Sequence, residues 1–354
     1  MDIKWREESF AWDNLYLAGD IGGTNTNLAL VGKKGESFGI IVEVVFASAS
    51  INGLADPIRQ TLEAAQSKNA DLVPESCCIC AAGPVENNFC TMTNLPWTID
   101  GNALQDQLGI PTEVINDFLG ISYGIPTLDV QNTDQIIPLP HSDGSTPEVQ
   151  PTTKAVIGPG TGMGVSFLTW DGKNYIPASS EGGHITFAPF DKESRMFRDY
   201  MESKLGALPG VEPLVSGMGL ANLYRFYRET GRLKPSQLWN DFDLAPATDL
   251  PALVATNSRE NEDCGRMMDL FVKLLAHYAS DLCCVFLPAG GFYLAGGVVM
   301  KNLSWLTEDN RFMKVFEKNY NPNLEKILKK TPVFIIKDYS ISLYGAANAA
   351  SSRL

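Results

Sequence analysis

Positive charge is scarce in this chain of 354 residues: 28 lysines and arginines stand against 41 aspartates and glutamates, for a formal net charge of −13. A nucleic-acid-binding protein needs a basic face, and an anionic membrane attracts basic segments, so we expect neither partner. The charge does not exclude ATP, because backbone amides and Mg²⁺ can bind phosphate locally. Small molecules are therefore the expected partners.

Long apolar runs are missing too. No stretch reaches the roughly 18 apolar residues of a membrane span. The opening residues, MDIKWREESFAW, carry charges where a signal peptide needs an apolar segment. We expect a soluble, cytoplasmic protein made without export. A peroxisome-type organelle is the alternative, because the final tripeptide Ser352-Arg353-Leu354 resembles a variant of the S-K-L signal.

Little in the sequence suggests disulfides or a cysteine-bound metal. The seven cysteines are an odd number, which fits a reducing compartment. The run 77–80 (Cys-Cys-Ile-Cys) has C-x-x-C spacing, but a metal would need two more ligands at matching spacing, and Cys283-Cys284 is the other adjacent pair. Both clusters lie in apolar runs, so we expect buried free thiols.

Two common nucleotide-binding signatures are also absent. No G-x-x-x-x-G-K-[ST] occurs, which excludes a Walker A loop. The glycine turn Gly158–Gly164 is followed by a strand pattern instead of a helix, which is the wrong context for a dinucleotide fold. A nucleotide would have to bind through another kind of glycine turn.

Such a turn lies near the N-terminus. The apolar run Leu15–Ala18 leads into Gly22–Asn25, and a second apolar run, Leu28–Val31, follows. Paired glycines permit positive φ and close approach of a ligand, and successive N–H groups can bind phosphate. Asp20, at the edge of the turn, is placed to meet a Mg²⁺ that travels with the phosphate. An ordinary Gly-rich hairpin is the alternative.

The pattern returns in the second half of the chain. Ala155–Ile157 is apolar, Gly158–Gly164 is rich in glycine, and Val165–Trp170 is apolar again. The chain thus contains two diverged copies of strand, glycine turn, strand, hairpin and strand, which could face each other across a cleft. Residues 131–153 are rich in Pro, Ser, Thr and Asp and are expected to form a surface excursion or linker.

The rest of the chain alternates strands with helices, and its length suggests two domains. Apolar runs predict further strands at 38–46, 76–82, 112–115, 292–295 and 332–336. Helical spacing predicts helices that begin at Pro57 and that span 102–108, 214–230, 265–287 and 343–350. The fold class is therefore α/β.

Asn116-Asp117 is the best candidate for a reacting centre. The pair follows a predicted strand, and ligands gather at the carboxyl ends of strands in open α/β sheets. A carboxylate there can accept the proton of an attacking hydroxyl, as phosphoryl transfer requires. The alternative is an Asp117 that merely caps the helix beginning near Phe118.

Further acidic residues suit a polyol. Glu181-Gly182-Gly183-His184 follows the second three-strand unit, and Glu212 precedes Val215-Ser216-Gly217. Each carboxylate can accept hydrogen bonds from two hydroxyls. Taken alone, Glu212 could be a surface residue, and His184 a structural histidine or a metal ligand. Gly296-Gly297 would let a flat ring lie against the backbone, although close packing of elements would explain them equally.

Together these stretches resemble the bacterial-type glucokinase family, within the sugar kinase, Hsp70 and actin superfamily. The matching motifs occur in the family's order from about residue 15 onward: DIGGTN at 20–25, AAGPV at 81–85, INDF at 115–118, GPGTG at 158–162, EGGH at 181–184, LVSG at 214–217 with Gly219-Leu220, and LAGG at 294–297. Each motif is weak alone, but the ordered set is highly specific.

The resemblance implies a fold and an activity. It implies two ribonuclease-H-like domains facing across a cleft, a small one formed by 1–127 plus 337–354 and a large one formed by 128–336. The implied reaction is ATP-dependent phosphorylation of D-glucose at its 6-hydroxyl, giving glucose 6-phosphate and ADP. Many relatives are homodimers, although nothing in the sequence identifies an interface.

The resemblance also implies roles for the site residues. Asp117 would be the general base, and Asp20 would hold Mg²⁺. The sugar hydroxyls would be bound by Asn116, Asp117, Glu181, His184 and Glu212. ATP would be bound by Asp20, Gly22, Gly23, Thr24, Asn25, Thr161 and Gly162 around the phosphates and by Gly296 and Gly297 beside the adenosine.

Several alternatives remain open. Related ROK kinases bind zinc beside an E-x-G-H element, but residues 185–191 offer no cysteine, so we expect no structural zinc. The substrate could be another hexose, such as mannose, fructose or an N-acetyl hexosamine. A non-catalytic sugar sensor on the same fold and a chaperone-like or actin-like ATPase rank lower. The segment Met1–Asn14 is an extension that the resemblance does not explain.

Overall fold

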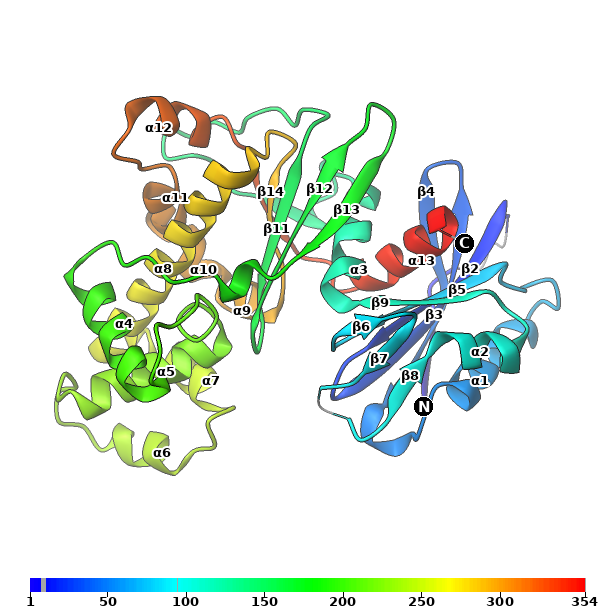
Figure 1. The fold of residues 1–354 in the computed structure, drawn as a ribbon, viewed down its shortest axis with the longest axis horizontal. Helices are drawn as coiled ribbons and strands as arrows, with labels where there is room; N and C mark the ends of the chain where they lie inside the picture. Colours follow the sequence, from blue (N-terminus) through cyan, green and yellow to red (C-terminus); the bar gives the residue numbers. More distant parts are fainter. Residues whose placement is uncertain (8–10, 94, 354) are drawn as a thin grey trace. The chain divides into compact units, whose positions relative to one another are not determined.

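The computed structural model describes residues 1–7, 11–93 and 95–353. By its internal contacts the chain divides into two compact units (Figure 1). Unit 1 comprises residues 1–132 and 338–354, and unit 2 comprises residues 133–337. Within the described residues, no helix has the length and apolar character that crossing a membrane would require.

Unit 1 is built on a six-stranded sheet of order β1-β4-β3-β2-β5-β9. Its strands are β1 (Asp2–Trp5), β2 (Asn14–Ile21), β3 (Asn25–Lys34), β4 (Ser37–Ala47), β5 (Ser76–Ala81) and β9 (Thr112–Asn116). The strands β2, β3 and β4 form an antiparallel meander, whereas β5 and β9 run parallel to β2. A small separate sheet contains β6 (Val85–Glu86), β7 (Phe89–Thr91) and β8 (Thr98–Asp100).

Helices cover both faces of this sheet. The unit's helices are α1 (Ala55–Gln66), α2 (Gly101–Leu108), α3 (Asp117–Gly124) and α13 (Ile341–Arg353), with short 3-10 turns at Ser48–Ser50 and Ile125–Thr127. Side chains alternate across a strand, so Leu17 joins the core beneath α1 and α2 while Ala18 joins the core beneath α13. The sheet is therefore buried on both sides.

The C-terminal helix α13 packs closely on α3. A Cβ atom built on Gly345 of α13 would overlap the carbonyl oxygen of Gly120 in α3, so the helices can approach this closely only with glycine at 345. Ala346, Ala347 and Ala350 are buried in the same core. The helix α13 thus belongs to unit 1, together with the N-terminal part of the chain (Figure 1).

Unit 2 repeats the plan with a sheet of order β10-β15-β14-β11-β12-β13. Its strands are β10 (Ile136–Pro138), β11 (Lys154–Pro159), β12 (Met163–Trp170), β13 (Tyr175–Ser180), β14 (Phe292–Leu294) and β15 (Val333–Ile336). Again three strands, β11, β12 and β13, form an antiparallel meander, and two more, β14 and β15, run parallel to the first. The prediction of two diverged copies in an α/β fold is confirmed.

The helices of unit 2 surround one large core. They are α4 (Lys192–Leu205), α5 (Gly217–Glu229), α6 (Leu238–Leu244), α7 (Leu250–Asn257), α8 (Glu262–Phe286), α9 (Gly297–Lys301), α10 (Leu303–Thr307), α11 (Arg311–Phe316) and α12 (Pro322–Leu328), with 3-10 turns at Gly182–His184 and Glu308–Asn310. The 25-residue helix α8 is central, and its apolar residues at steps of three and four, Met268, Phe271, Leu275, Tyr278 and Leu282, are all buried.

Some sequence predictions were wrong in detail. The segment 131–153 is not only a surface excursion, because β10 lies in it and pairs with β15, and His141 is fully buried. Helix α5 begins at Gly217 instead of 214, because Ser216 accepts a hydrogen bond from the Gly219 N–H and caps it. The buried-thiol prediction is confirmed for Cys77, Cys78, Cys80 and Cys283 and wrong for Cys284, which is exposed.

Candidate functional site

The candidate reacting centre of unit 1 lies where three parallel strands end together. Asp20 of β2 stands opposite Cys80 of β5, and Ala81 of β5 stands opposite Asn116 of β9. The register therefore brings Asp20 and Asn116-Asp117 to one edge of the sheet, although almost a hundred residues separate them in the sequence. Carboxyl ends of parallel strands are where α/β folds bind ligands.

Asn116, and not Asp117, caps helix α3. Its Oδ1 accepts hydrogen bonds from the N–H groups of Phe118 and Leu119 at 3.0 and 3.3 Å, and its Nδ2 donates to the carbonyl of Gly83 at 3.3 Å. Asp117 is the first residue of the helix, and its carboxylate accepts a hydrogen bond from Phe118 N–H at 2.9 Å. The capping interpretation of Asp117 is therefore wrong, because its neighbour makes the cap.

The environment of Asp117 suits a general base. Burial raises the pKa of its carboxyl group to about 6, the nearby Asp20 carboxylate adds to the rise, and the hydrogen bond from Phe118 opposes it. A carboxylate with a pKa near 6 is still ionised at neutral pH but accepts a proton more readily than an ordinary aspartate. Proton acceptance from a hydroxyl is the chemistry that this position offers.

Asp20 is held by the C-terminal helix. Ser342, in the first turn of α13, donates a hydrogen bond to Asp20 Oδ2 at 2.7 Å. Burial raises the pKa of Asp20, while the hydrogen bonds from Ser342 and Asn27 oppose the rise. A carboxylate in a fixed orientation is a suitable ligand for a hard cation such as Mg²⁺, directly or through water. Sequence reasoning missed Ser342, because nothing near residue 342 predicts a contact with residue 20.

The glycine turn at 22–25 is an exposed loop with a fixed base. Gly22 N–H donates to the Asn25 carbonyl at 2.9 Å, and the Ser48 hydroxyl donates to the Gly22 carbonyl at 2.8 Å. Neither Gly22 nor Gly23 has positive φ, so the expectation of positive φ is wrong here. The small glycines instead leave the backbone of the turn open to a ligand.

The second glycine turn, in unit 2, borders a cavity. Gly160 N–H donates to the Gly162 carbonyl at 2.8 Å, and Gly217 N–H, at the start of α5, donates to the Gly160 carbonyl at 2.8 Å. The adjoining cavity has a volume of about 840 Å³. Its lining includes Thr161, Met218, Gly297, Lys301, Asn302 and Trp305. This volume lies in the range of small-ligand pockets.

Gly296 and Gly297 form the join between β14 and α9. Gly296 has φ +93°, and a Cβ there would lie 3.2 Å from the Pro159 carbonyl oxygen, so this position needs glycine. Gly297 has open space where a Cβ would stand and lines the cavity. Close packing explains Gly296, whereas access for a ligand explains Gly297.

The cavity lining also contains residues that the sequence did not single out, among them Arg259, Ser304 and Trp305. The Arg259 guanidinium lies over the Trp305 ring, with its carbon 4.6 Å from the ring centroid. Two hydrogen bonds to Glu308, at 2.6 and 2.7 Å, and one to Ser304 hold Arg259 in place. The result is a guanidinium that is paired with a carboxylate and stacked on an indole, a flat surface that suits a planar ligand.

The predicted sugar-binding residues of unit 2 lie near its glycine turn. Glu181 precedes the 3-10 turn Gly182–His184, and its Oε2 lies 3.6 Å from His184 Nε2, with 91% of the Glu181 side chain and 64% of the His184 side chain exposed. Glu212 N–H donates to the Gly183 carbonyl at 2.9 Å, and Glu212 Oε2 accepts from Met163 N–H at 2.8 Å. His184 is therefore not a core histidine, and among the described residues no group of three metal-binding side chains occurs.

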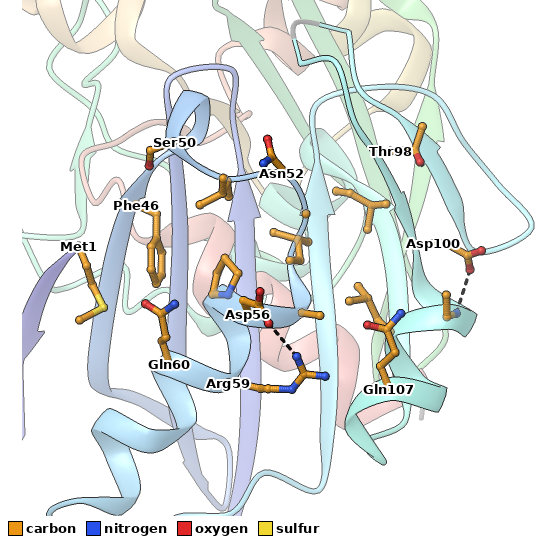
Figure 2. Close-up of a pocket in the computed structure, with 18 residues that line it drawn as sticks. Met1, Phe46, Ser50, Asn52, Asp56, Arg59, Gln60, Thr98, Asp100 and Gln107 are labelled. Atoms are coloured by element: carbon orange, nitrogen blue, oxygen red, sulfur yellow. Dashed lines mark hydrogen bonds and ion pairs between the residues drawn. The ribbon is translucent and has the colours of Figure 1, made fainter.

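A second cavity, of about 770 Å³, lies in unit 1 on another face of the sheet (Figure 2). Phe46, Asp56, Arg59 and Gln107 are among its lining residues, and Figure 2 shows the ion pair between Asp56 and Arg59, at 2.8 Å. Phe46 belongs to the core beneath α1 and α2. None of the predicted site residues lines this cavity.

The topology and the two sets of site residues define a protein of the sugar kinase, Hsp70 and actin fold class. The sequence model of the Glucokinase family matches residues 17–353, and the chain belongs to this family. Glucokinases of Nostoc punctiforme and Synechocystis sp. are 33% and 32% identical over 95% of this chain and cover 99% and 98% of their own lengths. The crystal structure of glucokinase from an Antarctic psychrotroph is similar too, with a TM-score of 0.78, 26% identity and coverage of 96% of this chain and 99% of that one.

Proposed function

We propose that this protein phosphorylates D-glucose at its 6-hydroxyl with ATP, giving glucose 6-phosphate and ADP. The observation that carries the proposal is the Asp117 carboxyl group, half-buried beside Asp20 at the ends of parallel strands with its pKa raised to about 6. Membership of the Glucokinase family supports the substrate and the phosphoryl donor.

On the acceptor side, Asp117 takes the proton of the 6-hydroxyl as its oxygen attacks the γ-phosphorus of ATP. The bond from that phosphorus to the β,γ-bridging oxygen breaks, and ADP leaves with the electron pair. Asn116 anchors the start of α3 and so orients Asp117. Glu181, His184 and Glu212 would accept or donate hydrogen bonds to the remaining hydroxyls, and Glu181 and His184 are exposed enough to reach a ligand.

On the donor side, the turn 22–25, Thr161 and Gly162 would bind the phosphates, and Gly296-Gly297 with the 840 Å³ cavity would take the adenosine. Asp20 would hold Mg²⁺, and its fixed carboxylate fits a hard cation. When bound, Mg²⁺ neutralises charge on the phosphate oxygens. Thr161 borders both the turn and the cavity, which supports one continuous nucleotide site in unit 2.

Alternative hexoses remain the second candidate. Exposed hydrogen-bonding groups such as Glu181 and His184 can bind sugar hydroxyls, but they do not by themselves exclude an epimer of glucose. We further propose a cytoplasmic location. The bacterial relatives give the peroxisomal alternative no support. Leu354, the last residue of the tripeptide, lies outside the described residues. The homodimer stays a prediction.

The test is ADP release from Mg·ATP with a panel of hexoses, comparing wild type with Asp117→Ala. We expect strong turnover with glucose and a loss of at least about 10²-fold in kcat in the variant, the usual contribution of a general base. Glucose binding should persist in the variant. Faster turnover with mannose or fructose would mean that this hexose, and not glucose, is the substrate. Binding of a sugar without turnover in wild type would favour the non-catalytic sugar sensor.

A further inference from the structure

Glu212 lies between the two turns that the proposed function assigns to sugar and phosphate. Its backbone N–H donates to the Gly183 carbonyl of the turn 181–184, at 2.9 Å. Its side-chain Oε2 accepts from the N–H of Met163, the residue that follows the turn 160–162, at 2.8 Å. One residue is thus hydrogen-bonded to both turns.

The segment that follows Glu212 strengthens the link. The Ser216 hydroxyl donates to the Glu212 carbonyl at 2.7 Å, and Gly217 N–H donates to the Gly160 carbonyl at 2.8 Å. The turn 160–162 is therefore held at its start by Gly217 and at its end by the Glu212 carboxylate. Movement of that carboxylate would therefore also move the turn 160–162.

Packing leaves little room for independent movement. A Cβ built on Gly162 would overlap the Glu212 carboxylate, and a Cβ built on Gly183 would overlap the carbonyl of Met163. Gly162 has no positive φ, so the requirement for glycine there comes from the carboxylate and not from the backbone conformation. By contrast, a Cβ on Gly160, in the same turn, would meet nothing within 4 Å.

We propose that Glu212 couples the two substrates: one carboxylate oxygen positions the phosphate turn through Met163 while the other accepts a sugar hydroxyl. A bound sugar then fixes the carboxylate and with it the turn, so sugar tightens nucleotide binding. By thermodynamic reciprocity, nucleotide tightens sugar binding by the same factor. This inference rests on the proposed function and deepens it, with Glu212 as a positioning residue for the donor.

The test measures the dissociation constant of the ATP analogue AMPPNP with Mg²⁺ by calorimetry, with and without saturating glucose. In wild type we expect glucose to tighten AMPPNP binding on the order of tenfold, within the usual range of coupling between sites. In Gly162→Ala the added methyl displaces the Glu212 carboxylate, and the ratio should fall to about one. In the control Glu148→Ala, which removes an exposed carboxylate of the same unit away from both turns, the ratio should stay at the wild-type value.

A second pair of variants keeps the test decisive if Gly162→Ala does not fold. Glu212→Gln retains an oxygen that can accept from Met163 N–H and should keep the coupling at saturating glucose, whereas Glu212→Ala should lose it. A merely structural role would weaken AMPPNP binding equally with and without glucose and leave the ratio unchanged. Coupling that survives in Gly162→Ala or Glu212→Ala, or is absent from wild type, overturns the inference.

The two proposals fail separately. A wild-type protein that turns over glucose without coupling keeps the proposed function and loses the role of Glu212. A wild-type protein that neither binds nor turns over a hexose contradicts the proposed function itself, because coupling between sugar and nucleotide cannot be measured when no sugar binds.

Discussion

The Ser342 hydroxyl donates a hydrogen bond to Asp20 at 2.7 Å across 322 positions of the sequence. The two residues meet because α13 packs on the face of the sheet that carries Ala18 and, two residues on, Asp20. The same turn of α13 accepts a weak hydrogen bond from the Cys80 thiol to the Ser342 carbonyl, at 3.7 Å. The helix α13 thus orients the Asp20 carboxylate, which lies at the end of β2 next to the glycine turn 22–25.

Ser342→Ala should weaken the use of Mg²⁺. Without the hydroxyl the Asp20 carboxylate loses its fixed orientation, and partners of this kind usually contribute 10- to 100-fold in metal affinity. We expect the apparent Mg²⁺ constant for activity to rise about tenfold while the KM for glucose stays unchanged. Ser352→Ala, an exposed serine in the same helix, is the control. A Mg²⁺ titration that is the same for all three proteins would contradict the role of Ser342.

The pH dependence of turnover should show an acid limb near pH 6. Asp117 must be ionised to accept the hydroxyl proton, and burial raises its pKa to about 6. The value of kcat/KM for glucose should therefore fall tenfold per pH unit well below 6 and level off above it. A limb near pH 4, the value of an ordinary aspartate, would show that the pKa of the base is not raised.

The same carboxylate should cost stability at neutral pH. An aspartate has a pKa of about 3.9 in the unfolded chain, whereas Asp117 has one of about 6 in the folded chain, so folding becomes less favourable as pH rises between these values. Asp117→Asn removes the half-buried charge and should raise the free energy of unfolding at pH 7.5 by about 3 kcal/mol.

Urea titration at two pH values tests this sign. The gain of Asp117→Asn should shrink as the pH falls through 6 and approach zero near pH 3, where Asp117 is mostly protonated in both the folded and the unfolded state. Asp106→Asn, at an exposed position of α2, should change little at either pH. A variant less stable than wild type at pH 7.5 would mean that Asp117 holds the fold together through its hydrogen bond to Phe118.

The sheets and turns were predictable because short-range patterns determine them. Apolar runs with glycine turns predict β2, β3, β11 and β12, and the strand ends then place Asp20 and Asn116-Asp117 at one edge. The helix starts were less predictable, since a cap depends on which side chain reaches the first N–H groups. Asn116 takes that role from Asp117, and Ser216 delays α5 by three residues.

The contacts between distant segments could not be predicted from one sequence. Ser342 on Asp20 and Glu212 on Met163 depend on how the elements pack, and no local pattern encodes them. The strand β10 escaped notice because it has three residues in a polar segment and is paired only at the edge of its sheet. His141 lies three residues beyond β10, and its burial depends on a partner distant in the sequence, Glu317.

The buried pair of His141 and Glu317 should be a large contributor to the stability of unit 2. The His141 Nδ1 lies 3.1 Å from Glu317 Oε2, and both side chains are almost fully buried. Burial alone would raise the pKa of Glu317, but hydrogen bonds from Ser142 and His141 outweigh it, so the pKa is lowered and this stabilisation is lost as pH falls through the folded value. Glu317→Ala leaves the buried His141 without its carboxylate partner and should lower the free energy of unfolding by about 3 kcal/mol at neutral pH. Removing Lys204 from its exposed pair with Glu229 should cost less than about 1 kcal/mol, and equal losses in urea titration would contradict the importance of burial.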